Sequence, residues 1–167
     1  EQPSVNTAGE VAEGITENSA MSLTADYDNA VTYDVSEEST VKITSSGTYI
    51  VTGSSEDGSI TVKKGTTGVV LVLQDLDLAS STGAVLSVNK LAEVQIIVSG
   101  NVTLTDNEDP DDENSADADV ADAYDGAAIK IKADSVAFIT GDGTLNINGN
   151  AKNGIKARIV SRLDAVL

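Results

Sequence analysis

The chain of 167 residues contains no cysteine and no histidine, and these two absences exclude several kinds of chemistry. Without a thiol there is no cysteine nucleophile, and without an imidazole there is no histidine general base. The side chains that zinc and most transition metals prefer are missing for the same reason. Any metal ion bound by this chain is therefore expected to be a hard cation held by oxygen atoms.

Aromatic side chains are also few, because the chain has four tyrosines, one phenylalanine and no tryptophan. Its apolar residues are mainly Val, Ile, Leu and Ala, which suit the thin, repeated layers of a β-sheet protein. So few rings argue against the broad stacking surface that proteins often use for neutral glycans. Tyr33, Tyr49 and Tyr124 are candidates for single contacts with a ligand, with ordinary packing as the alternative role of each.

Basic residues are outnumbered, with 10 Lys and Arg against 27 Asp and Glu, for a formal net charge of -17. This charge repels phosphate backbones and anionic lipid headgroups, so we expect no nucleic-acid partner. No hydrophobic run approaches the roughly 20 residues of a membrane span, so we expect no direct insertion into a membrane.

The chain divides by composition into two parts. Residues 1–20 are rich in Glu, Ser, Thr and Gly, as in a tether or a disordered terminus. We expect residues 1–36 to form a flexible leader and an N-terminal cap region. Residues 37–167 then form one domain, which carries an acidic insertion at residues 106–125.

An internal repeat organises the second part of the chain. Three apolar runs align, at Val69–Leu78, Val94–Leu104 and Val136–Leu145. A small turn and a shorter apolar segment follow each run. Val70 and Val94 lie 24 positions apart, whereas Val94 and Val136 lie 42 apart, so the second interval holds an insertion of about 18 residues.

This pattern predicts an all-β fold, a right-handed single-stranded parallel β-helix in which each repeat is one coil. Apolar and polar residues alternate in Ile60–Lys63 and in Ile129–Ile131, so each of these strands has one face toward solvent. A β-sandwich is the alternative, but it does not predict a fixed period with its insertion confined to one turn. Helical signal is almost absent, and residues 158–167 stay unassigned.

Two short segments have simple structural interpretations. Asp75 and Asp77 alternate with leucines, so both side chains are expected to face outward, where they keep a sheet surface soluble or line a row of cations. The run Gly141–Gly143 is too short for a phosphate-binding loop, and a tight corner between strands explains it better.

The motifs that carry a family resemblance lie in order along the repeat: Gly47–Gly53, Asp57–Val62, Leu71–Leu78, Leu104–Asp106, Ala127–Ile129, Asp134, Gly141–Asn150 and Asn153–Ile155. They resemble the bacterial cell-surface family of parallel β-helix carbohydrate-binding proteins. The resemblance implies calcium ions in the fold, binding of cellulose or polygalacturonate, and a location outside the cell or attached to its surface. Asp134 and Asn153, which lie in these motifs, join Tyr49 and Tyr124 as ligand-binding candidates.

The C-terminal end departs from the family pattern. After Ile155 that pattern continues with an acidic pair and further coils, whereas this chain continues with Lys156–Val160 and ends at Leu167. We expect either a short domain or a fragment truncated at this end. Because an uncovered end exposes apolar core and unpaired strand edges, we expect end-to-end or swapped homodimers.

The insertion at residues 106–125 contains ten carboxylates and no basic residue. Calcium takes six to eight oxygen ligands in flexible geometry, so a loop of this composition can form a cage for the ion, although its spacing is not that of an EF-hand. A solvated acidic loop without an ion is the alternative. Asp106, Asp122 and Asp125 are our first choices as ligands, because residues near the ends of the loop lose the least freedom on binding. The second choices are Asp111, Asp112, Glu113, Asp117 and Asp119.

These observations together predict extracellular, calcium-dependent, non-catalytic binding of an acidic plant-type polysaccharide such as polygalacturonate. Calcium held by the protein can accept uronate oxygens and so overcome the repulsion between two acidic polymers. One alternative is a polysaccharide lyase of the pectate-lyase type, although its candidate bases form no recognisable catalytic group; these are Lys130, Lys132, Lys152, Arg158 and Arg162. The other is a calcium-stabilised structural or adhesin solenoid.

Overall fold

The computed structural model describes residues 23–81, 83–106, 127–150, 153–157 and 162–165. Within these ranges the chain is all β, apart from one 3-10 turn at Tyr27–Asn29. No helix in the described residues is long and apolar enough to cross a membrane. The strands are β1 (Val31–Asp34), β2 (Thr40–Ile43), β3 (Gly47–Ser55), β4 (Ser59–Val62), β5 (Val69–Ala79), β6 (Leu86–Val88), β7 (Glu93–Ser99), β8 (Asn101–Thr105), β9 (Ala127–Ile131), β10 (Val136–Gly141), β11 (Thr144–Asn148), β12 (Asn153–Ala157) and β13 (Arg162–Ala165).

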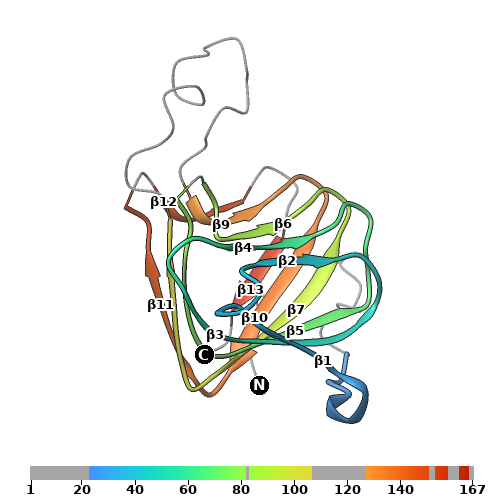
Figure 1. The fold of residues 1–167 in the computed structure, drawn as a ribbon. Coiled ribbons are helices and arrows are strands. Elements are labelled where there is room, and N and C mark those ends of the chain that lie inside the picture. Colours follow the sequence, from blue (N-terminus) through green and yellow to red (C-terminus); the bar gives the residue numbers. More distant parts are fainter. Residues whose placement is uncertain (1–22, 82, 107–126, 151–152, 158–161, 166–167) are drawn as a thin grey trace, which may run out of the picture.

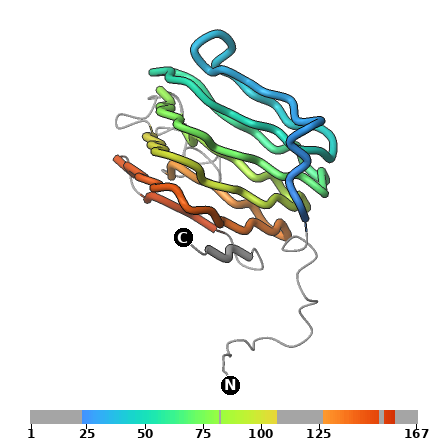
Figure 2. Tube along the Cα trace, turned by 90° about the horizontal axis from the view of Figure 1, so that it is seen from below, coloured from blue at the N-terminus to red at the C-terminus, as the bar shows by residue number. Residues whose placement is uncertain are grey.

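The strands form two sheets, and the strand pairs in the described residues are parallel. The first sheet has the order β1-β3-β5-β7-β10-β13, and β8 and β11 extend it beside the second half of β5. The second sheet has the order β12-β9-β6-β4-β2. From β2 onward the chain alternates between the sheets, so each repeat adds strands to both (Figure 1). Figure 2 shows the repeats following one another in sequence order. The all-β expectation is confirmed.

Strands near both ends of the chain, β1 and β13, belong to the first sheet. β1 pairs with β3, so the segment assigned to the N-terminal leader and cap region includes one strand of the first sheet. Residues 1–22 lie outside the described residues. At the other end, β13 pairs with β10 and places part of the unassigned segment 158–167 in the same sheet.

The true strand register differs by one residue from the sequence alignment. Val69 pairs with Val94, 25 positions later, and Val94 pairs with Ala137, 43 positions later. The alignment had matched Val70 with Val94. Its error has a physical cause, because Val69–Leu73 is apolar and buried at every position and has no alternation to set the register.

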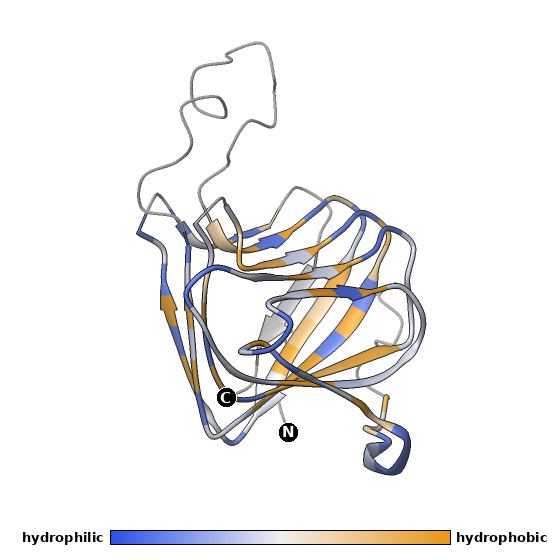
Figure 3. Ribbon diagram, in the orientation of Figure 1, coloured by the Kyte–Doolittle hydropathy of each residue, from blue (hydrophilic) through white to orange (hydrophobic). Residues whose placement is uncertain are grey.

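The hydrophobic core lies between the two sheets and is built from ladders of equivalent residues. In the first sheet one ladder joins Tyr49, Leu71, Ile96 and Ile139. In the second sheet the alternate positions of β2, β4, β6 and β9 are at most 1% exposed, among them Ile60 and Val62. Figure 3 shows the same alternation of hydrophobic and hydrophilic residues along the strands. Burial of branched aliphatic side chains in every repeat stabilises the stack.

The bend between β10 and β11 leaves no room for a side chain. Gly141 has φ of +124°, and a Cβ there would lie 2.2 Å from the carbonyl oxygen of Val98 and 2.6 Å from its nitrogen. The N–H of Gly143 donates to that same carbonyl at 3.1 Å. A Cβ on Gly143 would lie 2.5 Å from the carbonyl oxygen of Gly100. The run Gly141–Gly143 is therefore a tight corner packed on the preceding repeat, as the sequence indicated.

We expect Gly141→Ala to destabilise the protein more than Gly65→Ala. Gly65 also has a positive φ, of +78°, but a Cβ there meets nothing within 4 Å, so its substitution costs backbone strain alone, about 1–2 kcal/mol. Gly141→Ala adds a clash with the Val98 backbone, which raises the cost to about 3 kcal/mol or more. Chemical denaturation of the two variants measures the difference. Equal losses of stability would mean that the repeats are not packed this closely at the corner.

Candidate functional site

Asp106 is the one predicted calcium ligand that lies in the described residues. It follows β8 directly, is only 3% exposed, and its N–H donates to the carbonyl of Asn148 at 3.1 Å. The other predicted ligands fall in residues 107–126, outside the described residues: Asp111, Asp112, Glu113, Asp117, Asp119, Asp122 and Asp125. The part of the chain that the structure describes contains no group of three acidic side chains able to hold a metal ion. It therefore supplies one buried carboxylate at the start of the insertion.

In the sequence the insertion lies between β8, which belongs to the first sheet, and β9, which belongs to the second. It leaves after Asp106 and returns at Ala127, the first residue of β9. In the next repeat the equivalent turn runs from Asn148 to Asn153, and Asn153 pairs with Ala127. Asp106 and Asn153 therefore belong to the same stack of turns, on one side of the molecule.

Two of the remaining ligand-binding candidates, Asp134 and Tyr49, lie away from Asp106 and Asn153. Asp134 is exposed at the opposite end of β9, in the turn that leads to β10. Tyr49 is 8% exposed, its hydroxyl donates to the carbonyl of Ser45 at 2.9 Å, and its ring stacks on Tyr33 with centroids 6.4 Å apart. Packing thus accounts for Tyr49, and Tyr124 lies outside the described residues.

A second pair of acidic residues has a structural place. Asp75 and Asp77 are both exposed, as their alternation with leucines predicted. Asp75 has φ of +46° at an irregularity in the β3–β5 pairing, and its carboxylate accepts the N–H of Asn101 at 3.2 Å. Asp75 thereby satisfies a backbone donor at the bend between β7 and β8.

The carboxylate of Asp57 joins two successive turns, each of which leads from the first sheet to the second. One oxygen of Asp57 accepts the hydroxyl of Ser81 at 2.7 Å and the N–H of Ser81 at 3.1 Å. The hydroxyl hydrogen bond, followed by the backbone one, lowers the pKa of Asp57 from its ordinary value of 3.8. These hydrogen bonds connect the turn between β5 and β6, which contains Ser81, to the turn between β3 and β4, which contains Asp57.

A row of lysines on the second sheet was not recognised from the sequence. The strand register places Lys42, Thr61, Ser87, Lys130 and Lys156 side by side, one from each strand of that sheet. The strand neighbours of the first four residues are buried, so these four side chains lie on the outer face, whereas Ile155, beside Lys156 in the last strand, is itself 36% exposed. We call this set the lysine row.

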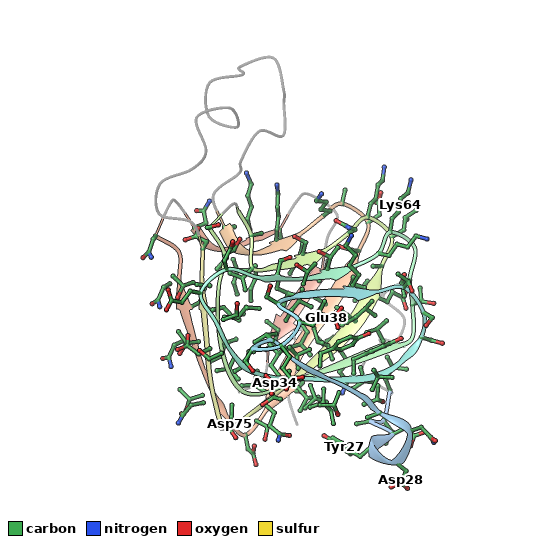
Figure 4. All side chains as sticks on the ribbon, viewed as in Figure 1. Tyr27, Asp28, Asp34, Glu38, Lys64 and Asp75 are labelled. Carbon is green, nitrogen blue, oxygen red and sulfur yellow. The ribbon has the colours of Figure 1, made fainter. Side chains whose placement is uncertain are left out.

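Further lysines lie in the turns that lead from the second sheet back to the first. These are Lys63, Lys64, Lys90 and Lys132. The described lysines are thus confined to this sheet and these turns, and Lys152 lies outside the described residues. Figure 4 labels Lys64 at one edge of the molecule, and the labelled Asp28, Asp34 and Asp75 lie away from it. The positive charges of the described lysines therefore lie together in one region of this acidic protein.

A polar pocket of about 330 Å³ lies between two of these turns. It is lined by Thr44, Ser45, Ser46, Lys63, Lys64, Gly65, Thr66 and Thr67. The N–H of Lys63 donates to the carbonyl of Ile43 at 2.9 Å, and the N–H of Gly47 donates to the carbonyl of Gly68 at 3.0 Å. These bonds tie the two turns together on both sides of the pocket.

The model of one protein family, described as "Carbohydrate-binding domain-containing protein", matches residues 37–160. The chain belongs to this family. The match covers most of the sequence and includes every strand from β2 to β12. No curated protein and no solved structure gives a significant match. Membership of the carbohydrate-binding domain family supports carbohydrate binding, makes a polysaccharide the expected partner, and is consistent with a protein that is not an enzyme.

We expect Asp57→Ala to lower the melting temperature at neutral pH, with Asp77→Ala as an exposed acidic control. Because the pKa of Asp57 is lowered in the folded state, its contribution is fully present above the ordinary value of 3.8 and is lost as the pH falls through the lower, folded-state pKa. The gap between wild type and Asp57→Ala should therefore stay constant from neutral pH down to about pH 4 and close only as the pH falls below 3.8. A gap that stays constant through this lower range as well would show that the ionised carboxylate is not responsible.

Proposed function

We propose that this chain is an extracellular, non-catalytic binding module for acidic polysaccharide of the polygalacturonate type. The observation that carries the proposal is the family match across residues 37–160, which coincides with the two described sheets. A surface of lysines supports an acidic rather than a cellulosic ligand, because ammonium groups form charge-assisted hydrogen bonds with carboxylates. The described lysines are confined to one side of the protein. On that side they attract an anionic polymer, although the net charge of -17 repels it overall.

The architecture we propose is a right-handed parallel β-helix. Each repeat contributes a strand to the second sheet and then one or two strands to the first, always in parallel register with the repeat before it. Successive coils of a β-helix stack in this way. Its long, regular outer faces suit a polymeric ligand.

Calcium is the cation we propose for the insertion. The buried carboxylate of Asp106 stands where the insertion leaves β8, and Asp122 and Asp125 come just before its return at Ala127. A hard cation would neutralise the ten carboxylates of this segment and could also accept uronate oxygens. Calcium bound in this way would stabilise the folded chain and add to glycan affinity.

Self-association is the last part of the proposal. Within the described residues β1, β11 and β13 are edge strands of the first sheet, and β2 and β12 are those of the second. Strands at the edge of a sheet offer backbone groups for pairing with a second copy. We propose end-to-end or swapped homodimers, which light scattering at several concentrations would detect.

We expect the purified protein to be retained on immobilised polygalacturonate more strongly than on cellulose. The same protein incubated with soluble polygalacturonate should give no rise in the absorbance of unsaturated uronate products. Such a rise, with calcium present, would establish a polysaccharide lyase instead. Failure to bind any glycan would leave a structural or adhesin role and would contradict the proposed function.

Calcium titrated into chelator-treated protein should bind saturably and raise the melting temperature, because a ligand specific to the folded state stabilises it. Asp106→Asn should weaken calcium binding by about tenfold, since affinity depends on the number of charged ligands. Asp142→Asn, an exposed residue at the β10–β11 bend, removes the same charge and should leave the affinity unchanged. Calorimetry measures both, and no heat of calcium binding would reject the cation site.

A further inference from the structure

We infer that the pocket between residues 44–46 and 63–67 binds one acidic sugar unit of the polysaccharide, through direct contacts with lysine. This inference rests on the proposed function, and it names the site and the chemistry that recognises the ligand. It requires no metal ion at the pocket. It therefore differs from recognition through calcium in the acidic insertion, which lies between β8 and β9 in the sequence, whereas the pocket lies where β2 leads to β3 and β4 leads to β5.

The chemistry of the lining matches a sugar that carries a carboxylate. Lys63 and Lys64 supply two ammonium groups, while Thr44, Ser46 and Thr67 supply exposed hydroxyl groups. A carboxylate can accept charge-assisted hydrogen bonds from the first set, and the ring hydroxyls can pair with the second. No acidic side chain lines the pocket. A neutral sugar would offer the two ammonium groups no charged partner.

The pocket is held in shape before any ligand arrives. The hydroxyl of buried Tyr49 donates to the Ser45 carbonyl at 2.9 Å and lies 3.1 Å from the Ser45 hydroxyl, which fixes the first turn from below. In the second turn, the N–H of Thr66 donates to the carbonyl of Lys63 at 3.1 Å. A Cβ on Gly68 would lie 3.1 Å from the Cβ of Ser46, so the two turns are in close contact. A rigid site loses less entropy on binding.

Two more lysines lie near the pocket, Lys42 on β2 itself and Lys90 in the next repeat. Lys42 is exposed and lies two residues before Thr44, and the carbonyl of Lys90 accepts the N–H of Gly65 at 3.0 Å. Three described carboxylates lie near this surface: Glu93, whose N–H donates to the carbonyl of Thr66 at 2.9 Å, Asp26, whose N–H donates to the hydroxyl of Thr48 at 2.8 Å, and Asp134. The positive groups therefore outnumber the negative ones around the pocket.

The negative charge elsewhere does not cancel this local field. Exposed carboxylates on the first sheet, such as Asp75 and Asp77, interact with a bound ligand through solvent, whose ions weaken exposed charges over about 8 Å at physiological salt. The lysines that line the pocket act at contact distance and are weakened less. Because the rest of the protein is acidic and repels polyanions, we expect them to bind on this side of the molecule.

The lysine row indicates the direction in which a bound polymer runs across the second sheet. Adjacent strands lie about 4.8 Å apart, so the row from Lys42 to Lys156 extends roughly 19 Å across the second sheet. It begins beside the pocket, and its members Thr61 and Ser87 add hydroxyl groups between the charged ends. A polysaccharide bound at the pocket would follow this row across the strands.

A sugar polymer fits this surface better than a nucleic acid. Proteins that bind single-stranded nucleic acid combine positive charge with aromatic rings on which the bases stack. None of the residues lining the pocket is aromatic, and the exposed Tyr27 lies in a turn before β1. The hydroxyl-rich lining is complementary to sugar hydroxyls instead.

The test compares two variants that make the same change in net charge. Lys63→Gln with Lys64→Gln removes two positive charges from the pocket, while Gln74→Glu with Asn146→Asp adds two negative charges at exposed positions of the first sheet. Affinity for polygalacturonate is measured by calorimetry, with methyl-esterified pectin as the uncharged match and a DNA oligonucleotide as a second polyanion. Melting temperature and calcium affinity are measured for each protein to confirm that fold and insertion are unchanged.

We expect the lysine variant to bind polygalacturonate roughly tenfold or more weakly, and the control to bind like the wild type. Wild-type protein should also prefer polygalacturonate over the esterified polymer. If both variants keep wild-type affinity, or lose it equally, the pocket is not the site, although the proposed function stands. If the wild type binds no polysaccharide, both the inference and the proposed function fail. Tighter binding of DNA than of polygalacturonate, sensitive to the lysine variant, would overturn the sugar assignment.

Discussion

Parallel, in-register pairing between successive repeats is the constraint on which the rest of this structure depends. Each strand uses its backbone groups to bond to the equivalent strand of the previous repeat, so equivalent residues stack in ladders. The ladder of Tyr49, Leu71, Ile96 and Ile139 is one result on the inside of the molecule. The lysine row is another, on the outside. One pairing rule therefore determines both the core and the surface chemistry.

The same constraint explains where the chain tolerates change. Within a strand the neighbours above and below fix size and shape, and at the β10–β11 bend even a methyl group on Gly141 would meet the Val98 backbone. In a turn the chain is free of this limit, and one turn carries an insertion while its equivalents stay short. Function can thus be added at turns without rebuilding the sheets. Both candidate regions, the acidic insertion and the lysine-lined pocket, are in turns.

Much of the fold could be predicted from the sequence, because alternation in β4 and β9 and the recurring apolar runs are local signals. The register could not, since Val69–Leu73 is buried at every position and contains no alternation. The lysine row was missed for a related reason. Lys42, Lys130 and Lys156 become neighbours only when the register is known across the insertion. Sequence spacing alone leaves them far apart.

Some features of the candidate site are visible in the sequence, and others depend on strands that are distant in the chain. The acidic composition of the insertion is visible in the sequence, and so is the position of Asp106 at its start. The burial of Asp106 and the packing of Tyr49 depend on strands that are distant in the chain. The pocket likewise joins two turns about 20 residues apart, through bonds such as that between Lys63 and Ile43. No local pattern marks that junction.

The uninterrupted apolar run Val69–Leu73 has a consequence for folding in the cell. In the unfolded chain it is an uncharged, mainly β-branched segment without proline, the composition that favours intermolecular β-aggregation. In the native structure the strands on both sides, β3 and β7, cover its backbone. Asp75 and Asp77 follow closely and place negative charge beside the segment, as gatekeeper residues do. Their exposure on the native surface therefore also protects the chain during the interval before its neighbouring strands have paired.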